Sequence, residues 1–136
     1  VATSDFPLII LESSSAAEVW NSYFKNGGKH SVRGYGDQTW KFYNCTFEST
    51  KTSGDIYLMY TTQGSITVKM WNCYSTFSTS GTKYSFYAAS GDHFDAYLQG
   101  TDYELTYRTT IYLMDEANRI KNTPEFCALR AACIVV

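Results

Sequence analysis

The sequence predicts an all-β protein, a single eight-stranded antiparallel up-and-down barrel with a short helix near each end of the chain. The length of 136 residues suits one domain, which we expect to cover residues 1–136. Apolar and polar residues alternate with a period of two through the middle of the chain, and this alternation is typical of strands. Short turn sequences separate the alternating segments.

The alternation is clearest in four consecutive segments. In residues 65–72, Ile66, Val68 and Met70 are apolar, whereas Thr67 and Lys69 are polar. The same pattern predicts strands at residues 83–88, 93–98 and 103–108. Further strands are expected at residues 30–35, 39–48, 55–61 and 109–114.

The segments between these strands have the composition of hairpin turns. Residues 52–54, 62–64, 79–81, 90–92 and 99–100 each contain a glycine beside polar residues. We therefore expect successive strands to pair antiparallel. Closing the sheet into a barrel would remove the edge strands, which otherwise promote aggregation. No linker, internal repeat or low-complexity segment is evident in the sequence.

Two short helices are expected outside the strands. Ser15 and Glu18 have the spacing of a capping box, which predicts a helix that begins at Ala16 and ends at residues 26–28. Thr123 and Pro124 predict the start of a second helix over residues 124–133. The apolar stripe of the first helix would contain Val19, Trp20, Tyr23 and Phe24.

The four cysteines predict disulfide bonds and an extracellular, secreted protein. An even number of cysteines in a short chain allows two disulfides, whose pairing the sequence leaves open. Zinc is not expected, because no cysteine pair has the spacing of a metal site and His30 and His93 are isolated. The cysteines are Cys45, Cys73, Cys127 and Cys133.

Charge and hydropathy limit the possible partners. The net charge of −2 and the absence of long basic runs argue against nucleic acid. No segment approaches the roughly 20 apolar residues of a membrane span, so no membrane insertion is expected. The N-terminus does not read as a signal peptide, because no basic residue precedes the apolar residues 6–11. Asn44 begins a glycosylation sequon, which agrees with secretion.

The predicted order of a short helix, about eight up-and-down strands and a second helix resembles the lipocalin plan. Thr101-Asp102-Tyr103 is similar to the Thr-Asp-Tyr turn that lipocalins carry between their sixth and seventh strands. Arg119 lies where the family often has an arginine that closes the bottom of the barrel. The resemblance implies a barrel that binds a small ligand.

Among lipocalins, the chain looks most like a divergent member of the tick salivary, histamine-binding-protein-like group. Glu18-Val19-Trp20 takes the place of the usual Gly-x-Trp and is similar to the Asp-x-Trp variant of those proteins. They also carry cysteines in the second strand and the C-terminal segment, as Cys45, Cys127 and Cys133 would here. Their amine motif has Cys-Asp after the Asp-Tyr turn, where this chain has residues 104–107, so the motif does not support histamine or serotonin binding.

No motif predicts catalysis. The sequence lacks a nucleophile with its base, a metal-ligand cluster and a phosphate loop. His93 lies beside Asp95 on the polar face of a strand, which indicates a solvated histidine. We therefore expect no enzymatic activity and no cofactor.

The main functional hypothesis is a hydrophobic pocket inside the barrel that sequesters a fatty acid, eicosanoid or amine. A barrel of this size is either filled by its side chains or holds one small ligand, and both alternatives remain open. Tyrosine hydroxyls would anchor a bound ligand, and two arginines could pair with a lipid carboxylate. The predicted ligand-binding residues are Trp40, Phe42, Tyr57, Met70, Tyr84, Phe86, Phe94, Tyr103, Tyr107, Arg33 and Arg108.

The alternative hypothesis is a secreted protein-binding or inhibitory module that acts through its outer face. Aromatic residues on the side opposite the predicted core would form the interface, with Trp71 and Tyr87 as anchors. Carbohydrate binding by such surface aromatics is a third possibility. The oligomeric state is not predicted. The outward aromatic residues are Tyr35, Tyr43, Tyr60, Trp71, Tyr87, Tyr97 and Tyr112.

Overall fold

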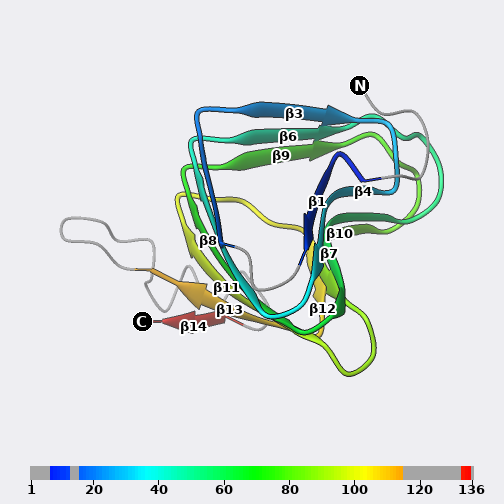
Figure 1. Cartoon of the computed structure of the whole chain (residues 1–136). Helices are drawn as coiled ribbons and strands as arrows, with labels where there is room; N and C mark the ends of the chain where they lie inside the picture. Colours follow the sequence, from blue (N-terminus) through cyan, green and yellow to red (C-terminus); the bar gives the residue numbers. More distant parts are fainter. Residues whose placement is uncertain (1–6, 13–15, 115–132, 136) are drawn as a thin grey trace.

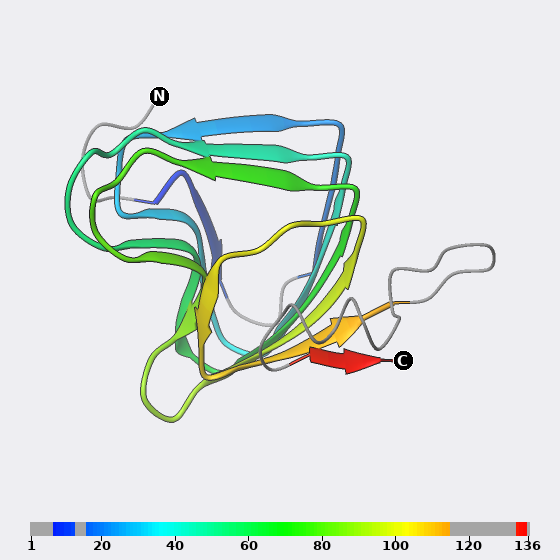
Figure 2. The same cartoon turned by 180° about the vertical axis from the view of Figure 1, so that it is seen from behind.

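The computed structural model describes residues 7–12, 16–114 and 133–135, which form a parallel β-solenoid of about three turns. Each complete turn, or coil, consists of three consecutive strands, one in each of three sheets. The chain turns a corner between strands and returns to lie beside the preceding coil (Figure 1). Seen from behind, the three sheets enclose a common interior (Figure 2).

The three sheets differ in length. The five-stranded sheet contains β1 (Ile9–Glu12), β4 (His30–Tyr35), β7 (Ile56–Gln63), β10 (Lys83–Ala88) and β12 (Leu105–Tyr107), in spatial order. The six-stranded sheet contains β14 (Cys133–Val135), β13 (Thr109–Leu113), β11 (His93–Gln99), β8 (Ser65–Trp71), β5 (Gln38–Tyr43) and β2 (Ala16–Trp20). The three-stranded sheet contains β3 (Tyr23–Asn26), β6 (Thr46–Ser49) and β9 (Tyr74–Phe77).

The predicted antiparallel barrel is wrong, and so is the lipocalin assignment. Every strand pair among the described residues is parallel. The reason lies in the turns: glycine and polar residues mark hairpin turns, but they also suit corners that need a residue with positive φ. Most corners here carry a single such residue, for example Gly64 with φ of 84° between β7 and β8. The composition of the turns therefore did not distinguish a corner that leads to the next sheet from a hairpin that reverses the chain.

The corner between the six-stranded and three-stranded sheets shows this most clearly. Asn21, Asn44 and Asn72 occupy it in successive coils with φ of 51°, 52° and 52°. Asparagine tolerates the left-handed region better than most residues. Asn44 also donates a hydrogen bond from Nδ2 to Oδ1 of Asn21, 3.1 Å away. The exposed asparagine of the sequon therefore belongs to a structural asparagine ladder.

The predicted N-terminal helix is wrong as well. Residues 16–20 and 23–26 form β2 and β3, which pair with β5 and β6. The apolar residues 17, 19 and 24 are half-buried against the core, whereas Trp20 and Tyr23 are exposed, so the true period is two. Ser15 lies outside the described residues, as do residues 124–132 of the second predicted helix; Cys133 begins β14. No helix able to cross a membrane occurs in the part of the chain that the structure describes.

The chain has a structural repeat that the sequence did not reveal. Ile9 pairs with Val32, 23 residues later, and the spacing then widens to 27 between Val32 and Met59 and again between Met59 and Phe86. These four residues lie in neighbouring strands of one sheet. The unequal spacing and the changing side chains hide the repeat from an inspection of the sequence alone.

In the part of the chain that the structure describes, large apolar side chains pack the interior. Trp40 donates from Nε1 to Oε1 of Gln38 at 2.7 Å and meets Phe94 edge-on at 5.9 Å. The largest fully buried side chains include Trp40, Phe42, Phe47, Phe86 and Phe94. Burial of these rings from three sheets is the main favourable contribution to stability.

A substitution of Gly34 would show how tightly this interior is packed. A Cβ at this position would lie 2.5 Å from Cζ2 of Trp40, closer than the two atoms can approach. We expect Gly34→Ala to destabilise the fold by about 1–3 kcal/mol, because the core must shift to admit it. Urea unfolding measures the change. In a Trp40→Phe background the same substitution should cost less. An unchanged midpoint in the single variant would show that the core is looser than described.

Candidate functional site

The outer side of the five-stranded sheet carries two rows of large side chains that we call the tyrosine face. The first row contains His30, Tyr57, Tyr84 and Leu105, and the second contains Arg33, Tyr60, Tyr87 and Tyr107. Each row crosses β4, β7, β10 and β12, because parallel pairing stacks equivalent residues on one another. The tyrosine face therefore gathers residues that are far apart in the sequence.

A stacked irregularity in the strands brings the two rows close together. In β4, β7 and β10 the rows are separated by two residues that are both buried, instead of by one. In β7 these are Leu58 and Met59, between Tyr57 and Tyr60. The same arrangement recurs in each coil, so Tyr57 and Tyr60 both point outward with their equivalents.

The rings of the tyrosine face are in contact throughout. Tyr57 stacks on Tyr87 with centroids 4.0 Å apart and planes 14° apart, and His30 stacks on Tyr60 at 4.4 Å. Tyr84 meets Tyr57 and Tyr87 edge-on at 5.5 and 5.1 Å. Such contacts add roughly 0.5–1.5 kcal/mol per pair beyond burial, so they hold the rings in place.

Three cations lie over these rings. Nζ of Lys29 is 4.8 Å from the ring centre of Tyr57, and the guanidinium of Arg33 is 5.4 Å from that of Tyr60. The third, Arg108, lies 5.4 Å from the ring of Tyr107. The cation–π attraction restrains both partners of each pair. The tyrosine face thus combines ordered aromatic rings with positive charge.

The electrostatics of Tyr57 reflect its place inside the cluster. Burial is the largest cause that raises the pKa of its phenol, to about 12, and the neighbouring Tyr87 and Asp55 add to the effect. The phenol therefore stays neutral and acts as a hydrogen-bonding group at physiological pH.

The six-stranded sheet carries a second, narrower set of aromatic contacts. Trp20, Tyr43 and Trp71 form a ladder in which neighbouring centroids lie 3.8 and 4.5 Å apart and the planes are within 10° of parallel. Tyr97 stacks on Tyr112 at 4.5 Å. Nearly parallel stacking occupies ring faces, which leaves mainly ring edges for a ligand.

The structure separates the predicted ligand-binding residues into two groups. The first group lies in the filled interior and contains Trp40, Phe42, Met70, Phe86 and Phe94, with Tyr103 packed against it. The second group lies outside and contains Arg33, Tyr57, Tyr84 and Tyr107, with Arg108 at the corner after β12. The prediction therefore placed the second group on the wrong side of the sheet.

The outward aromatic residues are also distributed over two sheets. Tyr60 and Tyr87 belong to the tyrosine face, and Tyr35 lies beside Arg33. Tyr43, Trp71, Tyr97 and Tyr112 lie on the six-stranded sheet. Sequence reasoning missed Lys29 and His30 as members of the cluster, because only the register between coils brings them to Tyr57 and Tyr60.

The polar side chains of the described residues contact both other side chains and the backbone of the adjacent coil. Nε2 of His93 lies 3.2 Å from Asp95 and 3.1 Å from Thr110, in a group with substantial exposure to solvent. No group of three or more metal-ligating residues occurs in the described ranges. Several aspartates accept hydrogen bonds from backbone N–H groups of the adjacent coil, for example Asp37 from Ser65, Asp55 from Thr82 and Asp92 from Gly64.

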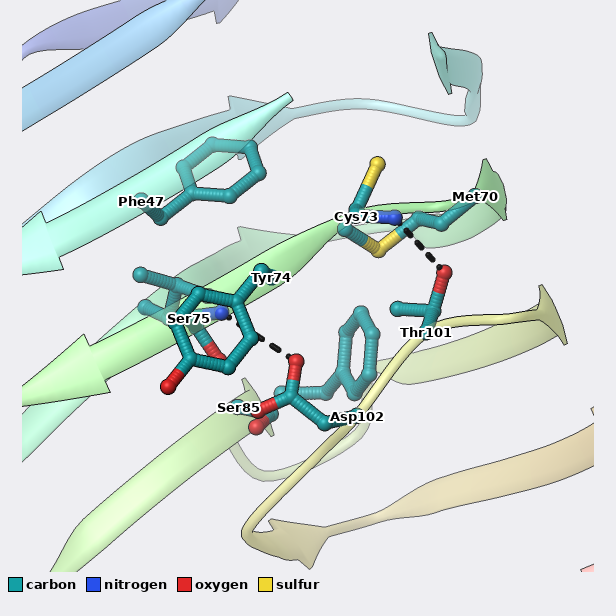
Figure 3. A pocket seen from close by; sticks show the side chains of 10 residues that line it. Phe47, Met70, Cys73, Tyr74, Ser75, Ser85, Thr101 and Asp102 are labelled. Atoms are coloured by element: carbon teal, nitrogen blue, oxygen red, sulfur yellow. Dashed lines mark hydrogen bonds between the residues drawn. The ribbon is translucent and has the colours of Figure 1, made fainter. Parts of the chain in front are cut away.

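Figure 3 shows the small pocket at the end of the three-stranded sheet. Its volume of ≈ 10 Å³ is about that of one water molecule. Oγ1 of Thr101 and Oδ1 of Asp102 each accept a backbone hydrogen bond at 3.2 Å, from Cys73 and Ser75 respectively. Thr101-Asp102-Tyr103 is therefore not a hairpin turn. Its first two side chains cover the edge of β9, where no fourth strand follows among the described residues.

Cys45 and Cys73 are free thiols. Cys45 and Cys73 are buried, and each Sγ lies 3.4 Å from a carbonyl oxygen of its own corner, that of Tyr43 or Trp71. Burial raises the pKa of the Cys73 thiol to about 11, which keeps it protonated and unreactive. The predicted disulfides are thus not found for these two cysteines; Cys127 lies outside the described residues.

Comparison with known proteins assigns the chain to no family. No protein-family model matches the chain, and neither a curated protein nor a solved structure matches it.

Substitutions of Asp102 would test whether its side chain covers the edge of β9. We expect Asp102→Ala to cost about 1.5–3 kcal/mol, because it removes a charged acceptor from the N–H of Ser75. Asp102→Asn keeps an acceptor oxygen and should cost less. Chemical unfolding measures the stability, and hydrogen exchange should show faster exchange at the Ser75 amide in the alanine variant. Equal protection of that amide in both variants would contradict the assignment.

The raised pKa of Tyr57 predicts a stability change at high pH. The folded state keeps the proton up to about pH 12, whereas the unfolded state loses it near the ordinary value of 10.0. The stabilising contribution is therefore complete below pH 10 and is lost as the pH rises toward 12. We expect the Tm of the wild type to fall more steeply over this range than that of Tyr57→Phe. Parallel Tm curves would contradict the prediction.

Proposed function

We propose that the protein is a binding module that recognises another protein through the tyrosine face. The observation that carries the proposal is the ordered cluster of five tyrosines and three cations on the outside of the five-stranded sheet. The hypothesis of a ligand sequestered in the interior has less support, because large apolar side chains pack the interior of the described residues.

The composition of the tyrosine face favours a protein partner. Tyrosine and arginine are enriched at the centres of protein interfaces, and they dominate the residues whose truncation weakens binding most. A tyrosine side chain supplies a large apolar ring and a hydroxyl with few rotatable bonds. Tyr60, Tyr87 and Arg33 would form the centre of such an interface, and Tyr107, which is 42% exposed, would lie toward its edge.

The rigid arrangement of the rings in the tyrosine face also favours binding. Rings that already stack on one another lose little rotational freedom when a partner covers them, so less of the binding energy is offset by entropy. Beside Arg33, a depression of ≈ 270 Å³ is lined by Glu12, Tyr35, Gly36 and Gln63. This recess would receive a side chain of the partner.

The extracellular location stays a prediction. Its support from disulfides is weaker, because Cys45 and Cys73 are free thiols. The exposed Asn44 retains its sequon.

The proposal is tested by affinity capture from the natural source with wild-type protein and two variants. Tyr87→Arg alters the centre of the tyrosine face, whereas Tyr97→Arg makes the same change on the outer side of the six-stranded sheet. We expect a protein bound by the wild type to be recovered at least about tenfold less with Tyr87→Arg, which corresponds to about 1.4 kcal/mol. Recovery with Tyr97→Arg should equal that of the wild type.

Three results would contradict the proposal. If Tyr87→Arg recovers as much of the partner protein as the wild type, the tyrosine face is not the interface. Selective loss with Tyr97→Arg would move the interface to the six-stranded sheet. Specific retention of a polysaccharide in place of a protein would favour carbohydrate binding. Circular dichroism and Tm show whether each variant is folded.

A further inference from the structure

The cations of the tyrosine face lie at its two ends, with aromatic rings between them. At one end, Lys29 and Arg33 lie over two rings of β7 whose centres are 5.5 Å apart. At the other end, Arg108 lies over the ring of Tyr107 in β12. The strands β7 and β10 separate β4 from β12 in the sheet. The tyrosine face therefore has positive charge at both ends and apolar rings in the middle.

Neither row of the tyrosine face contains a carboxylate. Two acidic residues border it: Asp55 just before β7, and Glu12, which pairs with Tyr35 in a neighbouring row. Oδ1 of Asp55 accepts the backbone N–H of Thr82 at 3.0 Å, so this carboxylate is engaged in the corner. The charge over the rings is thus positive, although the whole chain has a formal net charge of −2.

Arg33 is well placed to pair with a carboxylate of a partner. Its guanidinium lies over two rings, 4.8 Å from that of Tyr35 and 5.4 Å from that of Tyr60. Its Nε is buried and has no hydrogen-bond partner among the described residues. A partner therefore reaches the guanidinium through its two Nη groups, whose fork fits the two oxygens of a carboxylate. Water is already excluded from part of this cation, which strengthens its attraction to an opposite charge.

We propose that the partner presents an extended acidic segment to the tyrosine face, with a carboxylate at each end and an apolar side chain between them. This inference rests on the proposed function and names the chemistry of the partner. Arg33 and Tyr107 lie three strand spacings apart, or about 14 Å. Four residues of an extended chain span about 13 Å, so acidic residues four positions apart reach Arg33 and Arg108. The apolar side chain lies on Tyr60 and Tyr87.

The arrangement of charge favours a protein segment over a sulfated polysaccharide. Between the two charged ends, the rows contain Tyr57, Tyr60, Tyr84 and Tyr87 and no cation. A polymer that carries charge along its whole length would bury its central charges against these rings without a partner, which is costly. A segment with an apolar centre and acidic ends matches the face in both charge and polarity.

The test selects peptides from a random display library on the immobilised full chain. We expect the selected peptides to be enriched in Asp and Glu relative to the unselected library. A synthetic copy of the best peptide should bind Arg33→Gln about tenfold more weakly than the wild type, as measured by fluorescence anisotropy. Arg33→Lys keeps the charge but loses the fork, so it should recover only part of the affinity.

Lys69→Gln provides the matched control. Nζ of Lys69 lies 5.6 Å from the ring centre of Tyr97 on the six-stranded sheet, so this change removes a cation over a tyrosine outside the tyrosine face. Lys29→Gln makes the same change on the face. We expect Lys29→Gln to weaken binding and Lys69→Gln to leave it unchanged. If circular dichroism shows that Arg33→Gln does not fold, this pair of lysine variants still decides the outcome.

Four results would overturn the proposal. Peptides that depend on Tyr87 but lack acidic enrichment would exclude an acidic partner and leave the proposed function intact. If no selected peptide loses binding with Tyr87→Arg, both proposals fail. Equal weakening by Lys29→Gln and Lys69→Gln would indicate attraction to the whole chain and not to this face. Retention on heparin that Arg33→Gln abolishes, with no peptide selected, would assign the face to a sulfated polysaccharide.

Discussion

The structure depends on the parallel backbone pairing between successive coils. This pairing places equivalent residues about 4.8 Å apart in neighbouring strands, so one side chain determines what its neighbours in the row can be. The asparagine ladder, the ladder of Trp20, Tyr43 and Trp71, and both rows of the tyrosine face follow from it. A residue in this fold acts mainly through the residues one coil before and after it.

Because the pairing keeps each row of side chains on one side of its sheet, inward rows serve packing, whereas outward rows are available for recognition. Inward rows pack the interior of the described coils with rings such as Trp40 and Phe94. Turn carboxylates such as Asp37 and Asp102 satisfy backbone N–H groups of the adjacent coil. What remains for recognition is the outer side of the sheets, where aromatic and cationic side chains lie in ordered rows.

The local pattern predicted many strands accurately. Residues 30–35 and 83–88 form strands with the predicted bounds, because alternation of apolar and polar residues is a property of each segment. The first helix was wrong because Ser15 and Glu18 have capping-box spacing while Val19 and Trp20 follow a period of two. The sequence identified Tyr57 and Tyr84 as binding residues but predicted that they line the interior. In the structure they lie on the outer side of the sheet, in the tyrosine face.

By itself, the sequence determined that the chain is rich in strands, where most of them lie, and which aromatic residues are available for recognition. Only the tertiary structure decided that the strands pair in parallel, which side of the sheet each ring faces, and that Lys29, His30, Tyr57 and Tyr60 meet. The physical reason is that alternation depends on adjacent residues, whereas strand pairing depends on the corners. At a corner such as that of Asn44, where φ is 52°, the chain continues onto the next sheet, and the strand before the corner pairs with one more than 20 residues away.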